Sequence, residues 1–112
     1  FSSPANRAIH TCIILANSLQ IDLKKIIICS ELYTFDMFEV FDFIKQIDDK
    51  YSNILLVGHN PAYTEISNYF SENKILNLPT ARWFCLKFDT DSWSKTIGLK
   101  PIHYSNNIYS ES

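Results

Sequence analysis

His59 is the residue of this sequence whose type and placement point most directly to chemistry, because an imidazole can bind or transfer a proton near neutral pH. It follows the apolar run 54–57, which is typical of a buried strand in a protein of alternating strands and helices. Gly58 frees the backbone at the end of that strand, and Asn60 and Pro61 are typical of a helix start. We therefore expect His59 at a strand end beside a helix N-terminus, where α/β proteins bind ligands and anions.

Arg7 is the second candidate. Ser3 as a cap and Pro4 at the first position predict a helix start, which places Arg7 in a first turn that disfavours a cation by about 0.3–1 kcal/mol. Its guanidinium can bind phosphate through two parallel N–H bonds. Neither this turn nor residues 61–64 carries a carboxylate, so the two helix starts indicate a site for a doubly charged oxyanion. The alternatives are a surface ion pair for Arg7 and a structural hydrogen bond for His59.

Other polar residues are weaker candidates. Glu31 follows a predicted strand and could act as a general acid or base, although a surface carboxylate is the simpler interpretation. Arg82 could face the same cleft or lie on an edge strand. We expect His10 to be solvated on a polar helix face, His103 to lie in a loose tail, and Asp36 to cap a helix.

Composition bounds the class of protein. The 112 residues form one domain at most, with 46% hydrophobic and 20% charged residues. A net charge of −2 gives no reason to expect nucleic-acid or membrane partners. Cys12, Cys29 and Cys85 are isolated in apolar contexts, which predicts buried thiols, a reducing compartment and hence the cytoplasm. No metal-ligand spacing and no Gly-rich nucleotide loop is present, so we expect neither a metal nor a cofactor.

Hydrophobic periodicity predicts helices at 5–19, 36–47 and 61–70, since each has one apolar face. Strands are expected at 26–29 and 54–57, with an antiparallel hairpin formed by 83–88 and 95–99. The order predicts an α/β fold of the three-layer α/β/α sandwich type, in which residues 1–100 form the domain and 101–112 an irregular tail.

The same residues resemble a known family. Ser2-Ser3-Pro4-Ala5-x-Arg7-Ala8-x-x-Thr11, Leu32-Tyr33, Leu56-Val57-Gly58-His59-Asn60-Pro61 and Leu78-Pro79-Thr80 occur in the order and spacing of the SixA-type phosphohistidine phosphatases. These proteins belong to the histidine phosphatase superfamily, with the phosphoglycerate-mutase-like fold. The resemblance extends from residue 2 to about residue 99.

The resemblance implies phosphoryl chemistry without a metal. In that family, a strand ending in Arg-His-Gly supplies a nucleophilic histidine that becomes phosphorylated and is then hydrolysed. A second arginine, matching Arg7, and a second histidine, matching His59, hold the phosphoryl oxygens. The usual proton donor is an acid on a loop after a strand, for which Glu31 is the nearest match. The implied substrate is a phosphorylated protein or a small phosphoester, and phosphate is the product.

No Arg-His pair occurs in the 112 residues, so the nucleophile of the family is not matched here. Either the sequence is the C-terminal portion of a longer enzyme, as its start at Phe1 without a methionine suggests, or it is a remnant without catalysis. Loss of a central strand would expose unpaired backbone groups on its two neighbours, which favours the first explanation. The alternatives are a non-catalytic phosphate-binding or regulatory module and an α/β enzyme of another class.

Overall fold

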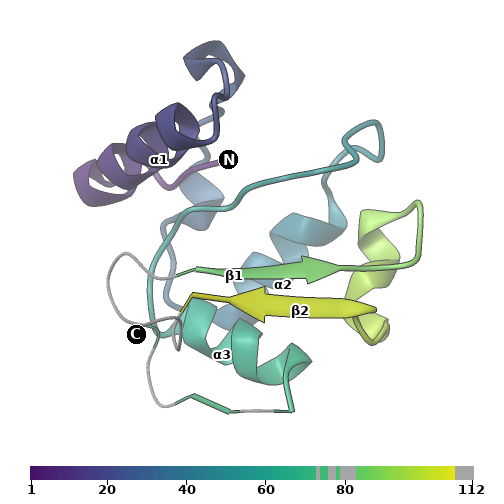
Figure 1. Ribbon diagram of the computed structural model, residues 1–112. Helices are drawn as coiled ribbons and strands as arrows, with labels where there is room; N and C mark the ends of the chain where they lie inside the picture. The colour runs from purple at the N-terminus through teal and green to yellow at the C-terminus, as the bar shows by residue number, and fades with distance from the viewer. Residues whose placement is uncertain (73, 76–77, 79–82, 108–112) are drawn as a thin grey trace.

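The computed structural model describes residues 1–72, 74–75, 78 and 83–107. In chain order these residues form α1 (Asn6–Ser18), the short 3₁₀ helices η1 (Leu23–Lys25) and η2 (Ser30–Leu32), α2 (Met37–Lys45), α3 (Ala62–Phe70), β1 (Phe84–Lys87), the 3₁₀ helix η3 (Trp93–Gly98) and β2 (His103–Asn106). Helices and strands mix in one compact unit with a small antiparallel sheet of β1 and β2 (Figure 1). The three helices predicted from periodicity are confirmed, each shorter than expected by one to three residues in total.

The start of the chain lies between two extended segments. Ser2 forms parallel bridges with Ile28 on one side and with Val57 on the other. The Ser2 amide donates to the Ile27 carbonyl at 2.9 Å, and the Val57 amide donates to the Phe1 carbonyl at 3.0 Å. The strands predicted at 26–29 and 54–57 are therefore present as extended backbone with single bridges, and they are too short to count as full strands.

Helix α1 begins later than its sequence suggests. The expected cap Ser3 is held by a 2.9 Å bond from its amide to the Val57 carbonyl, so its backbone belongs to the parallel pairing. The helix starts at Asn6, with the extended Ala5 before it and no side-chain cap. Its buried residues, Ala8, Cys12 and Ala16, recur every four positions and so form one face. That face packs around Val57 with half-buried Leu15, Ile26 and Leu55.

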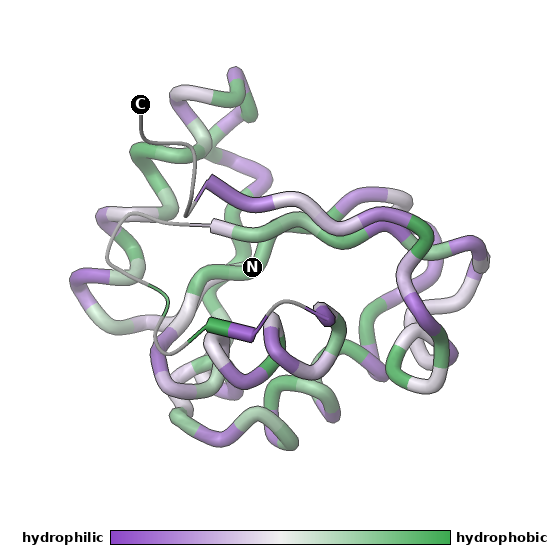
Figure 2. The backbone as a smooth tube through the Cα atoms, turned by 60° about the horizontal axis from the view of Figure 1, so that its bottom comes forward, coloured by the Kyte–Doolittle hydropathy of each residue, from purple (hydrophilic) through white to green (hydrophobic). Residues whose placement is uncertain are grey.

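The larger core lies between η2, α2 and α3. Its buried members are Leu32, Val40, Phe41, Ala62 and Ile66. Helix α2 begins as predicted, with the Asp36 carboxylate accepting the Phe38 amide at 2.9 Å. Edge-to-face aromatic packing closes the core, with the Phe41 and Phe70 ring centroids 6.0 Å apart. Figure 2 shows hydrophobic stretches gathered in the middle of the molecule around the chain start.

The predicted hairpin is wrong in its second strand. β1 pairs with His103–Asn106, which lie in the stretch expected to be an irregular tail, and residues 95–99 instead belong to η3 and its end. Trp93 explains the helical turn: its amide donates to Asp49 at 2.9 Å and its indole to the Tyr51 carbonyl at 2.8 Å. The Tyr104 hydroxyl lies 2.5 Å from Ser67 Oγ, so β2 is also tied to α3.

The cysteines differ from the expectation of three buried thiols. Cys12 is buried, Cys29 is half-buried and Cys85 is exposed on β1, and all three are free. Cys85 alternates with inward-facing neighbours along its strand, so its side chain is on the outer face. Among the described residues, no helix has the length and apolar character needed to span a membrane.

The core position of Leu32 gives a stability prediction. Leu32 is 1% exposed and its replacement in Leu32→Ala leaves a cavity, which we expect to lower the free energy of unfolding by about 2–5 kcal/mol. Leu19→Ala, at a side chain that is 59% exposed, is the matched control and should change it by less than about 1 kcal/mol. Urea denaturation followed by circular dichroism measures both. Equal losses would show that the η2 core is not built as described.

Candidate functional site

The parallel pairing brings the two predicted helix starts together. Ser2 is bridged to Val57, so the next residues, Ser3 and Gly58-His59, leave the pairing side by side. Ser3 Oγ lies 2.8 Å from His59 Nε2, across 56 positions of sequence. The Ser-Ser-Pro segment before α1 and the Gly-His-Asn segment before α3 thus meet at one hydrogen bond.

His59 also lies against two aromatic rings. The Tyr33 ring is tilted by 34° to the imidazole with centroids 5.1 Å apart, and the Phe35 ring meets it edge-to-face at 5.7 Å. Both aromatic residues come from the segment between η2 and α2, and each is 58% exposed. They form a wall beside the imidazole, which is itself half-buried.

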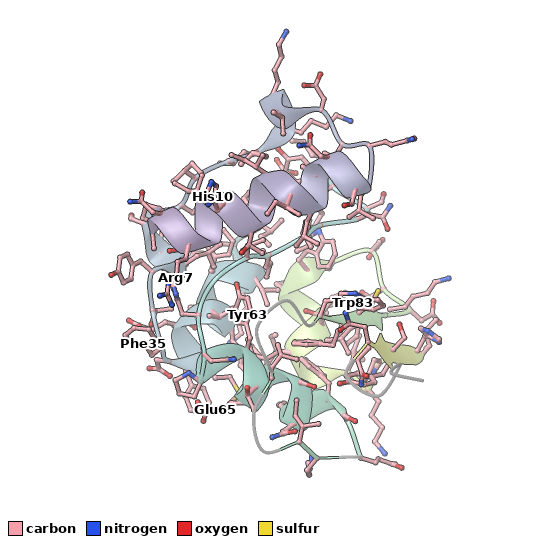
Figure 3. The ribbon with its side chains drawn as sticks, turned by 60° about the vertical axis from the view of Figure 1, so that its left-hand side comes forward. Arg7, His10, Phe35, Tyr63, Glu65 and Trp83 are labelled. Atoms are coloured by element: carbon pink, nitrogen blue, oxygen red, sulfur yellow. The ribbon has the colours of Figure 1, made fainter. Side chains whose placement is uncertain are left out.

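Arg7 lies in the first turn of α1, where no acidic residue is present. Its side chain is exposed, and no ion pair joins it to the described part of the chain. Figure 3 shows its guanidinium projecting from α1 on the side where Phe35 and Tyr63 are labelled. Arg7 is four residues from Ser3, so at most about 14 Å of chain separates it from the Ser3–His59 bond. The surface ion pair considered as the alternative for Arg7 is not formed with the described residues.

Asn60 serves the structure rather than the chemistry. Its side-chain carbonyl accepts the Thr64 amide at 3.1 Å and the Thr64 hydroxyl at 3.0 Å. Its amide group donates to the Leu78 carbonyl at 2.7 Å. Asn60 therefore satisfies an amide of the first turn of α3 and also anchors the chain near Leu78, although Pro61, predicted as the first helical residue, takes the cap position in place of Asn60. Helix α3 itself begins at Ala62, directly after Pro61.

Glu31 belongs to η2 and lies beside α2. It is exposed, accepts the Ser30 hydroxyl at 3.4 Å and lines a hollow of about 210 Å³ together with residues of α2, among them Glu39 and Asp42. None of its described contacts is with Ser3 or His59. Burial, and secondarily the Glu31 carboxylate, raises the pKa of the neighbouring Cys29 thiol, so this cysteine is not an activated nucleophile.

The remaining candidates are outside the site or outside the described residues. His10 is exposed on α1, as expected, and His103 is exposed on β2, opposite Lys87. Arg82 and most of the Leu78-Pro79-Thr80 motif lie outside the described residues. The expectation that the third helix starts without a carboxylate is wrong: α3 begins at Ala62, so its first turn includes Glu65, which is exposed.

Sequence reasoning missed three contributors to the site. Ser3 was assigned only as a helix cap, and Tyr33 and Phe35 were not connected with His59. Phe35 carried a signal, because it lies just before the helix predicted at 36–47 and is therefore a hydrophobic residue without an expected core position. Tyr33 occurs in the Leu32-Tyr33 motif, but nothing in a single sequence links that motif to an imidazole 26 positions later.

Tyr63 packs against Gly58, the residue before His59. Its hydroxyl is buried and has no hydrogen-bond partner among the described residues, and burial raises the pKa of its phenol. A Cβ at Gly58 would lie 2.8 Å from the Tyr63 hydroxyl oxygen and 3.3 Å from the Leu32 carbonyl oxygen. Gly58 is therefore required by this close approach rather than by its backbone angles.

Comparison with known proteins finds no match to the chain among family models, curated proteins or solved structures.

The contact between Gly58 and Tyr63 can be tested by a double-mutant cycle. We expect Gly58→Ala to lower the free energy of unfolding by about 1–3 kcal/mol, because a Cβ is forced against a buried phenol. Tyr63→Phe removes the partnerless hydroxyl and should recover part of this loss in the double variant. Gly98→Ala, where no atom lies within 4 Å of the added Cβ, is the control. Strictly additive losses in the cycle would contradict the contact.

The buried phenol also predicts a pH dependence. The pKa of Tyr63 is raised in the folded protein, so its stabilising contribution is complete below the unfolded-state pKa of about 10 and is lost as the pH rises above it. We expect the stability of Tyr63→Phe to fall less steeply than that of the wild type between about pH 9 and pH 11, measured by urea denaturation. Tyr33→Phe, at an exposed tyrosine, should follow the wild type. Parallel curves for wild type and Tyr63→Phe would refute the assignment.

Proposed function

We propose that this chain supplies the phosphoryl-holding residues of a histidine-phosphatase-type site, on a three-layer phosphoglycerate-mutase-like fold. The function is hydrolysis of a phosphorylated substrate, with phosphohistidine on a signalling protein as the preferred one. The observation that carries the proposal is the 2.8 Å hydrogen bond between Ser3 and His59, since it joins the two motifs at the starts of α1 and α3. The free thiols suit a reducing compartment, and we assign the protein to the cytoplasm.

Arg7 and His59 have separate tasks in this proposal. Arg7 brings a full positive charge and a planar fork of donors to the start of α1, whose unpaired amides already favour an anion. The absence of an acid in that turn leaves the guanidinium free of competition from its own helix. His59 adds an imidazole at the adjacent strand end, held in place by Ser3. Together they stabilise the negative charge that spreads over the phosphoryl oxygens in the transition state.

The reaction proceeds in two displacements. A nucleophilic imidazole nitrogen forms a bond to phosphorus while the bond to the leaving group breaks, and water then displaces that imidazole to release phosphate. None of the 112 residues belongs to an Arg-His pair, so the nucleophile must be supplied by residues outside these. Glu31 as proton donor has no support from its contacts with Ser30 and α2. The leaving nitrogen of a phosphohistidine is basic and can arrive already protonated, so it leaves as a neutral imidazole with less need of a proton donor from the site.

A second candidate is a phosphate-binding module without turnover. The missing Arg-His pair favours it, because a chain that holds a phosphoryl group through Arg7 and His59 without that nucleophile would bind the group without turning it over. The two candidates share one binding site and differ only in hydrolysis.

Titration with inorganic phosphate tests the site that both candidates share. We expect phosphate to shift the backbone amide resonances of Ser3, Arg7 and His59, and expect Arg7→Ala to weaken binding by about 10-fold to 100-fold through the loss of charge-assisted hydrogen bonds. His59→Ala should also weaken it. Lys24→Ala and His103→Ala remove a cation and an imidazole from exposed positions on η1 and β2 and should leave binding unchanged.

Turnover of p-nitrophenyl phosphate and of a phosphohistidine protein then separates the candidates. Hydrolysis that depends on Arg7 and His59 supports the phosphatase, and binding without hydrolysis supports the module. If phosphate affinity is the same in the wild type, Arg7→Ala and His59→Ala, both candidates are excluded.

A further inference from the structure

The Ser3 hydroxyl is wholly buried and has two neighbours. Ser3 is 0% exposed, its Oγ accepts the Ala5 amide at 3.3 Å, and the same oxygen lies 2.8 Å from His59 Nε2. A hydroxyl has one proton to donate and two lone pairs to accept with. The direction of the bond between Ser3 and His59 decides which ring nitrogen of His59 carries its proton.

Only one direction satisfies every buried group. If Nε2 donated to Ser3, the serine proton would point into the buried interior, with no described acceptor other than the ring nitrogen that already carries a proton. A buried donor left unpaired destabilises the fold, because it loses its hydrogen bond to water and gains none in the protein. If Ser3 donates to Nε2, the hydroxyl uses its proton on the imidazole and a lone pair on the Ala5 amide. Both partners of Ser3 are then satisfied.

We propose that Ser3 is a positioning residue that fixes His59 as the neutral tautomer protonated on Nδ1. This inference rests on the proposed function in one respect: it assigns the Nδ1–H group as the donor that His59 offers to the phosphoryl oxygen. Nε2 is occupied by Ser3, so it is not the atom that meets the anion. Arg7 then supplies the positive charge of the described site, and His59 supplies a directed hydrogen bond.

The aromatic wall supports the same arrangement. The Tyr33 ring is tilted by 34° over the imidazole and Phe35 meets it edge-to-face, so the imidazole cannot turn far out of its plane without breaking both contacts. A ring flip would exchange Nε2 with Cε1 and so break the bond to Ser3, and Tyr33 and Phe35 hinder the rotation between the two orientations. Tyr33 and Phe35 thus restrain the plane of the His59 imidazole, and the Ser3 hydroxyl determines which of its nitrogens is protonated.

The test is the ¹⁵N spectrum of the imidazole, recorded on the 112-residue chain without phosphate at about pH 8, where an ordinary imidazole is neutral. Protonated and unprotonated ring nitrogens resonate far apart, so the tautomer is read directly. We expect a protonated Nδ1 and an unprotonated Nε2 in the wild type. A wild-type spectrum with a protonated Nε2 overturns the proposal, whatever the variants show.

Ser2 provides a matched control for Ser3. Both are 0% exposed, but the Ser2 hydroxyl donates to the Ser3 carbonyl at 3.0 Å and does not contact His59. We expect Ser3→Ala to shift His59 towards the Nε2-protonated tautomer and to weaken phosphate binding by about threefold to tenfold. Ser2→Ala should leave the tautomer unchanged. An unchanged tautomer in folded Ser3→Ala overturns the proposal, whereas an altered tautomer without any phosphate binding upholds it and removes the proposed function.

Discussion

The structure depends on the placement of residues 1–3 between two parallel extended segments. Ser2 is bridged to Ile28 on one side and to Val57 on the other, and Phe1 and Ser3 add backbone hydrogen bonds to the 55–57 segment. The register of this pairing is strongly constrained, since a shift of one residue along a strand would turn every side chain to the opposite face. This pairing determines where α1 starts, which residues face Val57, and which residue meets His59.

A second constraint follows from burying a polar link at the end of that pairing. Ser3 carries its hydroxyl into a region that water does not reach, so the hydroxyl must be satisfied by protein groups, and His59 is one of them. The Ala5 amide completes the set around Ser3. Tyr63 shows the opposite case a short distance away, because its hydroxyl is buried without a described partner and Gly58 must remain without a side chain to make room for its ring.

The proposed division of work between Arg7 and His59 follows from their different surroundings. Arg7 is exposed and unpaired with any described acid, so its charge is available to a ligand that reaches the start of α1. His59 is half-buried, bonded to Ser3 and flanked by two aromatic rings, so it is oriented before any ligand arrives. Preorganisation of this kind lets a hydrogen bond contribute to binding without a further entropic cost.

The sequence by itself determined the helix that carries Arg7 and the strand end that carries His59. Apolar periodicity, the Asp36 cap and the Asn60-Pro61 helix start are signals that neighbouring residues give without the rest of the fold. It misplaced the partner of β1, because η3 is fixed by bonds from Trp93 to Asp49 and Tyr51, more than 40 positions earlier. Only the tertiary structure decided that Ser3 binds His59, that Tyr33 and Phe35 enclose the imidazole, and that Glu31 lies beside α2. Such contacts join residues far apart in the chain, and hydrophobic patterning specifies which face of an element is buried without specifying which segment will cover it.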